Sequence, residues 1–393
     1  MKLVNEMLDK LPIDVWKNKN LKWLDHCCGM GNFPIAVYLR LIDELKDEIK
    51  DVKKRKKHIL ENMLFMCELN KKNALVCKQI FDVNNEYKLN IYNGDSLKAD
   101  YDNEFGIKQF DIIIGNPPYN ASGTKATGNT IWQKFLLLSF NLIKSNGYIA
   151  LMHPSGWRKP MSENGKSNNL FDLMTSKNNM LYLEMHDSKD GIKTFNCGTK
   201  YDWYVINIKN TINNTEIIDE KKNKHLLNLK NYSFLPNSNI ELFNKIYCKN
   251  PDITNILYSR SSYGSDKKWT SKVKNDTYKY TVVHSTTKSG CRYLYSNTNN
   301  NGFYGIKKVI FGDSGINEPI IDTDGTLLMS EHAMAIPIIN NNEKEIYECI
   351  KSNKFKDFLK SCMWSNFQID WRLFTYLNKN FYIEFIKDIT HEN

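Results

Sequence analysis

The chain has 393 residues, of which 41% are hydrophobic and 12% aromatic, so it is long enough to bury the cores of two or three domains. Its formal net charge of +10 favours an acidic partner, nucleic acid or an anionic surface, although a Lys-rich solvated surface gives the same balance. The sequence has no apolar run of about eighteen residues and no signal-peptide region, so we expect a cytoplasmic protein with reduced thiols and no membrane contact. It also has no CxxC pair and no zinc-type histidine spacing, so we expect no metal.

Strand and helix signals alternate along the first half, which is typical of an α/β domain with a mostly parallel sheet. Strands are predicted at 21–25, 63–68, 89–92, 111–115, 148–152, 181–185 and 203–207, and helices at 32–64 and 131–143. We interpret the basic run at 53–57 as a solvated helix face or a helix break.

The character of the chain changes near residue 210. Residues 211–230 are polar and are predicted to be irregular, and beyond them strand-like pieces mix with helical ones such as 343–362. We therefore expect two domains, a regular α/β domain at 1–210 and a mixed α+β domain at 211–393.

A glycine-containing turn at residues 25–33, with the sequence DHCCGMGNF, follows the first strand and opens a helix. Glycines there allow a ligand to approach the backbone closely. A dinucleotide-binding turn is the usual rival, but Pro34 replaces its third glycine, and Asp25 stands where it can face a cationic group. S-adenosylmethionine fits better, because Glu68 and Asp95 follow the next two strands and can accept from its ribose hydroxyls and its adenine amino group.

The tetrapeptide Asn116-Pro117-Pro118-Tyr119 follows the apolar strand at 111–115. The Asn116 side-chain oxygen can accept one N–H, and the two prolines fix a backbone that presents carbonyls without donors. Tyr119 offers a flat face for stacking. Such a tetrapeptide also occurs as an ordinary strand-ending turn, but together with the acids it favours a site that grips a planar amino group.

These segments resemble motifs I to IV of the gamma-class adenine-N6 DNA methyltransferases of restriction-modification systems and phages, most clearly over residues 21–160. The resemblance implies a Rossmann-like seven-stranded methyltransferase sheet at 1–210 and a C-terminal mixed α+β target-recognition domain at 211–393. It implies that a methyl group passes from S-adenosylmethionine to the N6 amino group of adenine in double-stranded DNA after base flipping. A separate cognate restriction endonuclease and a monomeric state are further expectations.

The resemblance also assigns roles to individual residues. The catalytic set is Asn116, Pro117, Pro118 and Tyr119. The cofactor-binding set is Asp25, Cys27, Gly29, Gly31, Phe33, Glu68, Asp95, Ser96 and Asn116. Phe195 is the candidate for a second aromatic beside the flipped base and Tyr201 is its alternative, with core packing an equal interpretation for either. One departure is the missing Thr-Pro of motif X before residues 4–8, which leaves the N-terminal wall of the cofactor pocket undefined.

Target reading is expected in the second domain, because no large insertion separates the glycine turn from the tetrapeptide. The predicted DNA contacts are Arg158, Arg260, Lys267, Lys268 and Arg292, for which a bare surface role is the alternative. Four other functions remain open at this point: methylation of cytosine N4, of an RNA base or of a protein glutamine, and DNA binding without catalysis.

Overall fold

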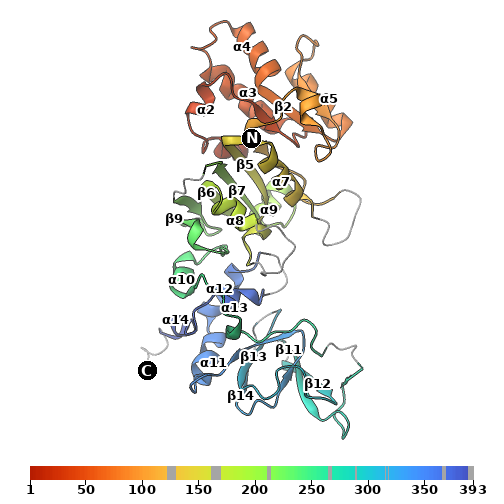
Figure 1. Ribbon diagram of the computed structural model, residues 1–393, viewed down its shortest axis with the longest axis vertical. Helices are drawn as coiled ribbons and strands as arrows, with labels where there is room; N and C mark the ends of the chain where they lie inside the picture. The colour runs from red at the N-terminus through yellow and green to blue at the C-terminus, as the bar shows by residue number, and fades with distance from the viewer. Residues whose placement is uncertain are drawn as a thin grey trace. The chain divides into compact units, whose positions relative to one another are not determined.

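The computed structural model describes residues 1–121, 130–160, 170–209, 214–263, 268–287, 290–314, 316, 318–364 and 369–387. Two compact units make up the chain (Figure 1). Unit 1 has the bounds Met1–Trp157 and Asn169–Lys230, and unit 2 has the bounds Arg158–Asn168 and Asn231–Asn393.

Unit 1 is built on a nine-stranded sheet in the order β3-β2-β1-β4-β5-β7-β6-β8-β9. Its strands are β1 Trp23–Asp25, β2 Leu64–Glu68, β3 Asn90–Asn93, β4 Phe110–Gly115, β5 Ile143–Pro154, β6 Asn179–His186, β7 Tyr201–Asn207, β8 Thr215–Ile218 and β9 Lys224–Leu227. The first five strands are parallel, and β7 runs antiparallel to both β5 and β6. The predicted seven-stranded methyltransferase sheet is confirmed, and β8 and β9 extend it.

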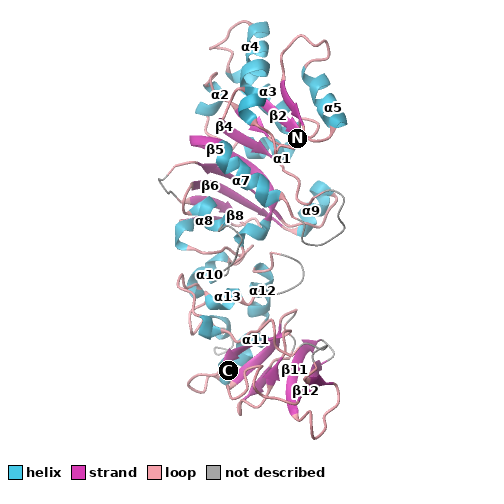
Figure 2. Cartoon of the chain, turned by 45° about the vertical axis from the view of Figure 1, so that its right-hand side comes forward, coloured by secondary structure: helices cyan, strands magenta, loops and turns pink. Residues whose placement is uncertain are grey.

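Helices cover both faces of this sheet (Figure 2). They are α1 Lys2–Leu8, α2 Asp14–Lys17, α3 Asn32–Glu44, α4 Val52–His58, α5 Lys71–Phe81, α6 Tyr101–Phe105, α7 Trp132–Leu142, α8 Leu170–Thr175 and α9 Ser188–Phe195, with short helical turns at Ile59–Met63 and Leu229–Asn231. Side chains of α1, α3 and α5 share one core with the sheet. On the other face Phe105 of α6 packs on Phe65, and Ser139 of α7 bonds to His26. Burial on both faces explains the uninterrupted isoleucines of β4.

Two predicted boundaries are wrong. The helix expected at 32–64 is interrupted between Glu44 and Val52, because the Asp51 side chain accepts from Lys54 N and starts a new helix there. In the described part of 211–230 the chain is not irregular: β8 pairs in parallel with β6, and β9 pairs with β8. Unit 1 therefore continues to Lys230 instead of ending at 210.

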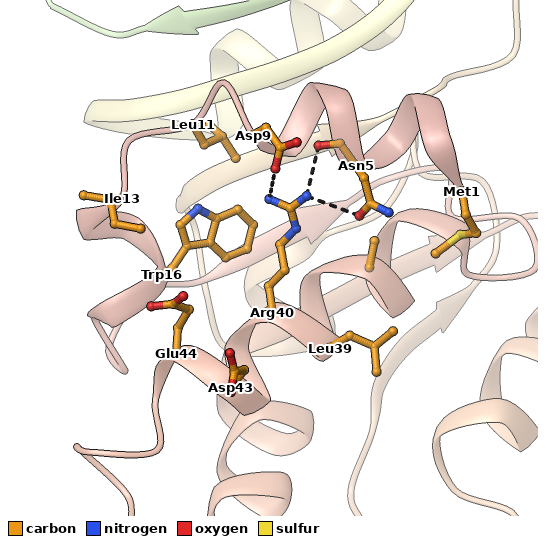
Figure 3. A pocket seen from close by; sticks show the side chains of 11 residues that line it. Met1, Asn5, Asp9, Leu11, Ile13, Trp16, Leu39, Arg40, Asp43 and Glu44 are labelled. Carbon is orange, nitrogen blue, oxygen red and sulfur yellow. Dashed lines mark hydrogen bonds and ion pairs between the residues drawn. The ribbon is translucent and has the colours of Figure 1, made fainter.

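Arg40 of α3 forms an ion pair and hydrogen bonds with residues of α1 and with Asp9, which follows it (Figure 3). The Arg40 guanidinium lies 2.8 Å from Asp9 Oδ1, donates to Asn5 O at 3.0 Å and Asn5 Oδ1 at 3.2 Å, and sits 5.2 Å from the Trp16 ring centroid. These groups line a cavity of about 630 Å³ that contains none of the predicted site residues. The N-terminal segment thus has a defined place although the expected Thr-Pro motif is missing.

Unit 2 contains two smaller sheets, in the orders β10-β12-β11-β15 and β14-β13-β16. Their strands are β10 Thr270–Ser271, β11 Tyr280–Thr287, β12 Gly290–Ser296, β13 Lys308–Gly312, β14 Ile320–Asp322, β15 Leu328–Met329 and β16 Ala333–Pro337. Its helices are α10 Ile240–Ile246, α11 Glu343–Lys351, α12 Asn353–Ser361, α13 Arg372–Thr375 and α14 Ile383–Ile386, with a short turn at Ile253–Asn255. The mixed α+β character predicted for this half is thus present.

Within the described ranges, no helix combines the length and apolar character needed to cross a bilayer. The same residues contain no group of three or more His, Cys, Asp or Glu side chains arranged to hold a metal ion.

Candidate active site

A cavity of about 680 Å³ opens at the carboxyl ends of the parallel strands of unit 1. Six of the predicted site residues line it: Cys27, Glu68, Asp95, Ser96, Asn116 and Pro118. The turn after β1, the ends of β2 and β3 and the corner after β4 therefore share one hollow, as expected for ligands of an open α/β sheet.

The turn after β1 is held by the carboxylate at the end of β2. Gly29 N donates to Glu68 Oε2 at 2.9 Å, and Asn70 N donates to Glu68 Oε1 at 2.7 Å. Gly29 and Gly31 have φ values of 56° and 91°, a left-handed conformation that side chains rarely adopt. Each Glu68 oxygen keeps a lone pair for a further donor, so this carboxylate is suited to paired hydroxyls.

Asp25 is buried below this turn, where its Oδ1 accepts from Cys27 N at 3.0 Å. The pKa of Asp25 is raised to about 7, mainly by burial; the hydrogen bond from Cys27 N lowers it and the charge of Glu68 raises it. A Cβ on Gly115 would lie 2.8 Å from Asp25 Oδ1, so only glycine leaves room for this carboxyl. A carboxyl group in this setting would bind a cationic group more strongly than an exposed one.

The Asn-Pro-Pro-Tyr corner carries two buried polar atoms without a hydrogen-bond partner in the described structure, Asn116 Oδ1 and the Tyr119 hydroxyl. Tyr119 O accepts from Ile131 N at 3.0 Å, which ties the corner to the start of α7. A buried acceptor without a partner is costly, so the Asn116 oxygen is the part of the cavity most clearly suited to an incoming N–H group.

The ring of Tyr119 begins a short row of aromatic contacts. The Tyr119 and Phe195 ring centroids are 6.3 Å apart at 78°, and Phe195 meets Tyr201 at 4.9 Å and 76°. Tyr201 is buried, donates to Asp190 and stacks on His186, so it serves the core. Phe195 is half-buried and is the better candidate for a second stacking face.

The residues that line the cavity do not include Asp25, Gly29, Gly31, Pro117, Tyr119 or Phe195. Two further predicted site residues are held in the protein interior. Phe33 is buried among the core side chains under α3 and does not line the cavity, because the helix turns it toward the sheet. Arg158 is also buried, and its guanidinium donates to the carbonyls of Leu235 and Pro236 and to Asn237 Oδ1. Those acceptors lie 77 or more residues further along the chain, so the local sequence gave no sign of them, and we withdraw Arg158 as a DNA contact.

The other predicted DNA contacts fall in unit 2. Arg260, Lys268 and Arg292 are exposed. Lys267 lies outside the described residues.

Several residues of the cavity escaped the sequence analysis, including His26, Leu69, Asn70, Ile131 and Phe135. His26 and Leu69 directly follow the acids that end β1 and β2, and that position is the signal that could have identified them. Phe135 lies in α7 and Ile131 directly precedes it, and the start of this helix reaches the cavity only because the chain returns after β4.

Residues 22–192 match the sequence profile of the Eco57I restriction-modification methylases. A protein described as an uncharacterized adenine-specific methylase of Mycoplasma pneumoniae is 29% identical where it matches, over 38% of this chain and 53% of the relative. This chain thus spans about half the length of that relative.

Two solved structures share the fold over most of the chain. The Type IIL restriction-modification enzyme MmeI in complex with DNA superimposes with a TM-score of 0.52 and 12% identity, covering 95% of this chain and 64% of that one. The Type ISP restriction-modification enzyme LlaGI, in complex with a DNA substrate mimic, superimposes with a TM-score of 0.50 and 12% identity. The match covers 87% of this chain and 49% of that one. At such identities the likeness concerns the fold alone.

Proposed function

We propose that this chain, which belongs through residues 22–192 to the Eco57I restriction-modification methylase family, methylates the N6 amino group of adenine in double-stranded DNA with S-adenosylmethionine as donor. The observation that carries the proposal is the shared cavity, in which the buried unpartnered Asn116 Oδ1 lies with Glu68 and Asp95. The named relative, described as adenine-specific, and the fold shared with DNA-bound restriction-modification enzymes support it.

Two residues that line the cavity, Glu68 and Asp95, and Asp25, which is buried below the turn after β1, carry the groups that the donor requires. Asp25 would face its ammonium group, Glu68 its ribose hydroxyls and Asp95 its adenine amino group. When bound, S-adenosylmethionine supplies a methyl group on a positively charged sulfur. The neutral thioether that remains keeps the electron pair of the broken C–S bond.

The chain's own part is to prepare the acceptor nitrogen. An aromatic amine is a weak nucleophile, because its lone pair is delocalised into the ring. Asn116 Oδ1 and the Pro117 carbonyl can each accept one of its N–H groups, which draws the nitrogen toward tetrahedral geometry and frees the lone pair. The nitrogen loses its extra proton after the N–C bond forms, so the site needs no strong general base, and positioning provides much of the rate.

Adenine inside a duplex does not reach such a cavity and has to be flipped out, at a cost of a few kcal/mol. Stacking on Tyr119 and Phe195 would return about 1–3 kcal/mol for the flipped base. Exposed basic residues of unit 2, Arg260, Lys268 and Arg292, would contact the phosphates. We further propose that the protein is monomeric and works with a separate restriction endonuclease.

A test is to incubate the protein with methyl-labelled donor and duplex DNA, RNA or protein, and then to identify the methylated product. We expect label in DNA, as N6-methyladenine at a defined sequence. Asn116→Ala should reduce turnover at least a hundredfold while its circular dichroism and thermal unfolding match those of the wild type. Label in RNA, in protein or on cytosine N4 would replace the proposed substrate, and full activity of Asn116→Ala would remove the amine-gripping role.

A further inference from the structure

We propose that His26 is a further cofactor-binding residue, whose bare Nδ1 accepts a hydrogen bond from the exocyclic amino group of the donor's adenine. The inference rests on the proposed function, because it assumes that an adenosyl group occupies the cavity at the carboxyl ends of the strands.

We assign the position of the His26 ring proton from its hydrogen bonds. Ser139 Oγ lies 2.8 Å from Phe135 O and 2.7 Å from His26 Nε2. A carbonyl can only accept, so we assign the single hydroxyl hydrogen of Ser139 to Phe135 O, and Nε2 then donates to Ser139 Oγ. With the proton on Nε2, the neutral ring has a free lone pair at Nδ1.

The His26 ring is neutral at ordinary pH. The residue is fully buried, and burial lowers its pKa to about 4. A neutral imidazole with its proton on Nε2 is an acceptor at Nδ1 and cannot donate there.

Nδ1 is one of the few buried side-chain polar atoms in the described chain that have no hydrogen-bond partner. A core histidine normally uses both ring nitrogens, since an unmet buried acceptor costs free energy. His26 lines the same cavity as Asn116, whose Oδ1 is also unpartnered. The cavity thus holds two buried acceptors. The proposed function assigns Asn116 Oδ1 to the amino group that is methylated, so His26 Nδ1 is left for an N–H group of the donor.

The contacts of His26 identify the end of the cavity that it serves. Its carbonyl accepts from Ser96 Oγ at 2.7 Å, and its ring centroid lies 5.5 Å from that of Phe135. The turn that contains Asp95 and Ser96 is the place to which the proposed function assigns the adenine ring. An exocyclic amino group has two N–H bonds, so Asp95 can take one and His26 the other.

A purely structural interpretation is that His26 only joins β1 to α7 through Ser139. That role uses Nε2 and leaves Nδ1 unexplained. The two roles are separable, because a ligand without the amino group would test Nδ1 alone.

The first test measures the affinity of S-adenosylhomocysteine and of its 6-deamino analogue, which lacks the exocyclic amino group, by isothermal titration calorimetry. We expect His26→Phe to weaken binding of S-adenosylhomocysteine about 2- to 13-fold, the equivalent of one ordinary hydrogen bond, and to leave binding of the analogue unchanged. His26→Gln, which keeps a side-chain acceptor, should recover part of the loss. Ser139→Ala removes the partner of Nε2 but retains the imidazole, so a loss of affinity in this variant that is equal for both ligands measures the packing role.

The remaining outcomes of this titration separate a failed inference from a failed proposed function. Equal loss for both ligands in His26→Phe would leave only the packing role and overturn the inference. Failure of the wild type to bind either ligand would instead count against the proposed function.

A second test needs no variant and is unaffected if His26→Phe fails to fold. In wild-type protein with ¹⁵N-labelled histidine, the Nδ1 resonance of His26 should show an unprotonated nitrogen and shift upfield when S-adenosylhomocysteine binds. The deamino analogue should leave it in place. The same shift with both ligands, or with neither, would contradict a hydrogen bond from the amino group.

Discussion

Asp25 is the residue for which a pH dependence follows most directly. Its pKa is raised to about 7 by burial, and only its ionised form attracts the ammonium group of the cofactor. Affinity for S-adenosylhomocysteine should therefore weaken as the pH falls below about 7, by roughly tenfold per pH unit. Calorimetric titrations between about pH 5.5 and 8.5 would measure this, with Asp25→Asn as a weak and pH-independent control.

The same carboxyl has the opposite effect on the stability of the ligand-free protein. Its folded pKa lies above its ordinary value of 3.8, so the folded state holds the proton more tightly than the unfolded state. Its contribution to the free energy of unfolding is fully present below about pH 4 and is lost as the pH rises toward 7. A wild-type protein whose affinity and stability profiles both coincide with those of Asp25→Asn would contradict a buried, proton-retaining carboxyl.

Tyr119 allows stacking to be separated from hydrogen bonding. Its hydroxyl is buried without a partner in the described structure, so Tyr119→Phe should keep the stacking face and leave stability unchanged or slightly higher. Tyr119→Ala should weaken capture of a flipped base by about 1–3 kcal/mol and leave cofactor binding nearly intact. Fluorescence of 2-aminopurine at the target position, read beside calorimetric cofactor binding, would distinguish these effects. Equal defects in Phe and Ala variants would assign the role to the hydroxyl instead of the ring.

At the scale of elements, Arg40 of α3 adds polar contacts to the apolar packing of the N-terminal helix. Arg40→Ala removes the ion pair with Asp9, the bonds to Asn5 and the contact with Trp16, so it should lower the free energy of unfolding by about 1–2 kcal/mol. Lys46→Ala is the matched control, because its pair with Asp43 is exposed, and it should cost less than about 0.5 kcal/mol. Urea unfolding measures both, and equal effects would show that Arg40 does not anchor α1.

Strand ends were the part of the fold most open to prediction. An apolar run such as that of β4 identifies a buried strand, and the polar residue after it identifies the edge where ligands bind. Strands that depend on a neighbouring strand for their hydrogen bonds were harder to predict. Thr215–Ile218 forms a strand only because β6 offers a free edge beside it, which four residues do not reveal.

A helix-capping residue also divides a helix that the sequence analysis predicts as one. The helix expected at 343–362 is two helices, α11 and α12, because the Ser352 side chain accepts from Phe355 N and starts the second one. Serine before such a run is a recognised start signal, so this break was readable from the sequence. The partners of Arg158 and the unpartnered nitrogen of His26 were not, since both depend on contacts between distant segments.

For the whole molecule, the net charge of +10 is the property that bears on a DNA substrate. The net charge is the same whether the basic residues are spread evenly over the surface or gathered in one binding face. The net charge alone therefore does not locate a DNA contact. Counterion release distinguishes them, because only basic groups that neutralise phosphates make affinity depend on salt.

Duplex affinity should therefore fall steeply between about 50 and 200 mM salt, with a slope that counts the phosphate contacts. Arg260→Ala and Arg292→Ala, at exposed positions of unit 2, should each reduce that slope by about one. Lys46→Ala removes the same single charge from an exposed pair in unit 1 and should leave the slope unchanged. Fluorescence anisotropy of a labelled duplex at several salt concentrations makes the comparison. A flat wild-type response would exclude duplex DNA as the partner, whereas equal changes in all three variants would mean that net charge, and not a binding face on unit 2, sets the affinity.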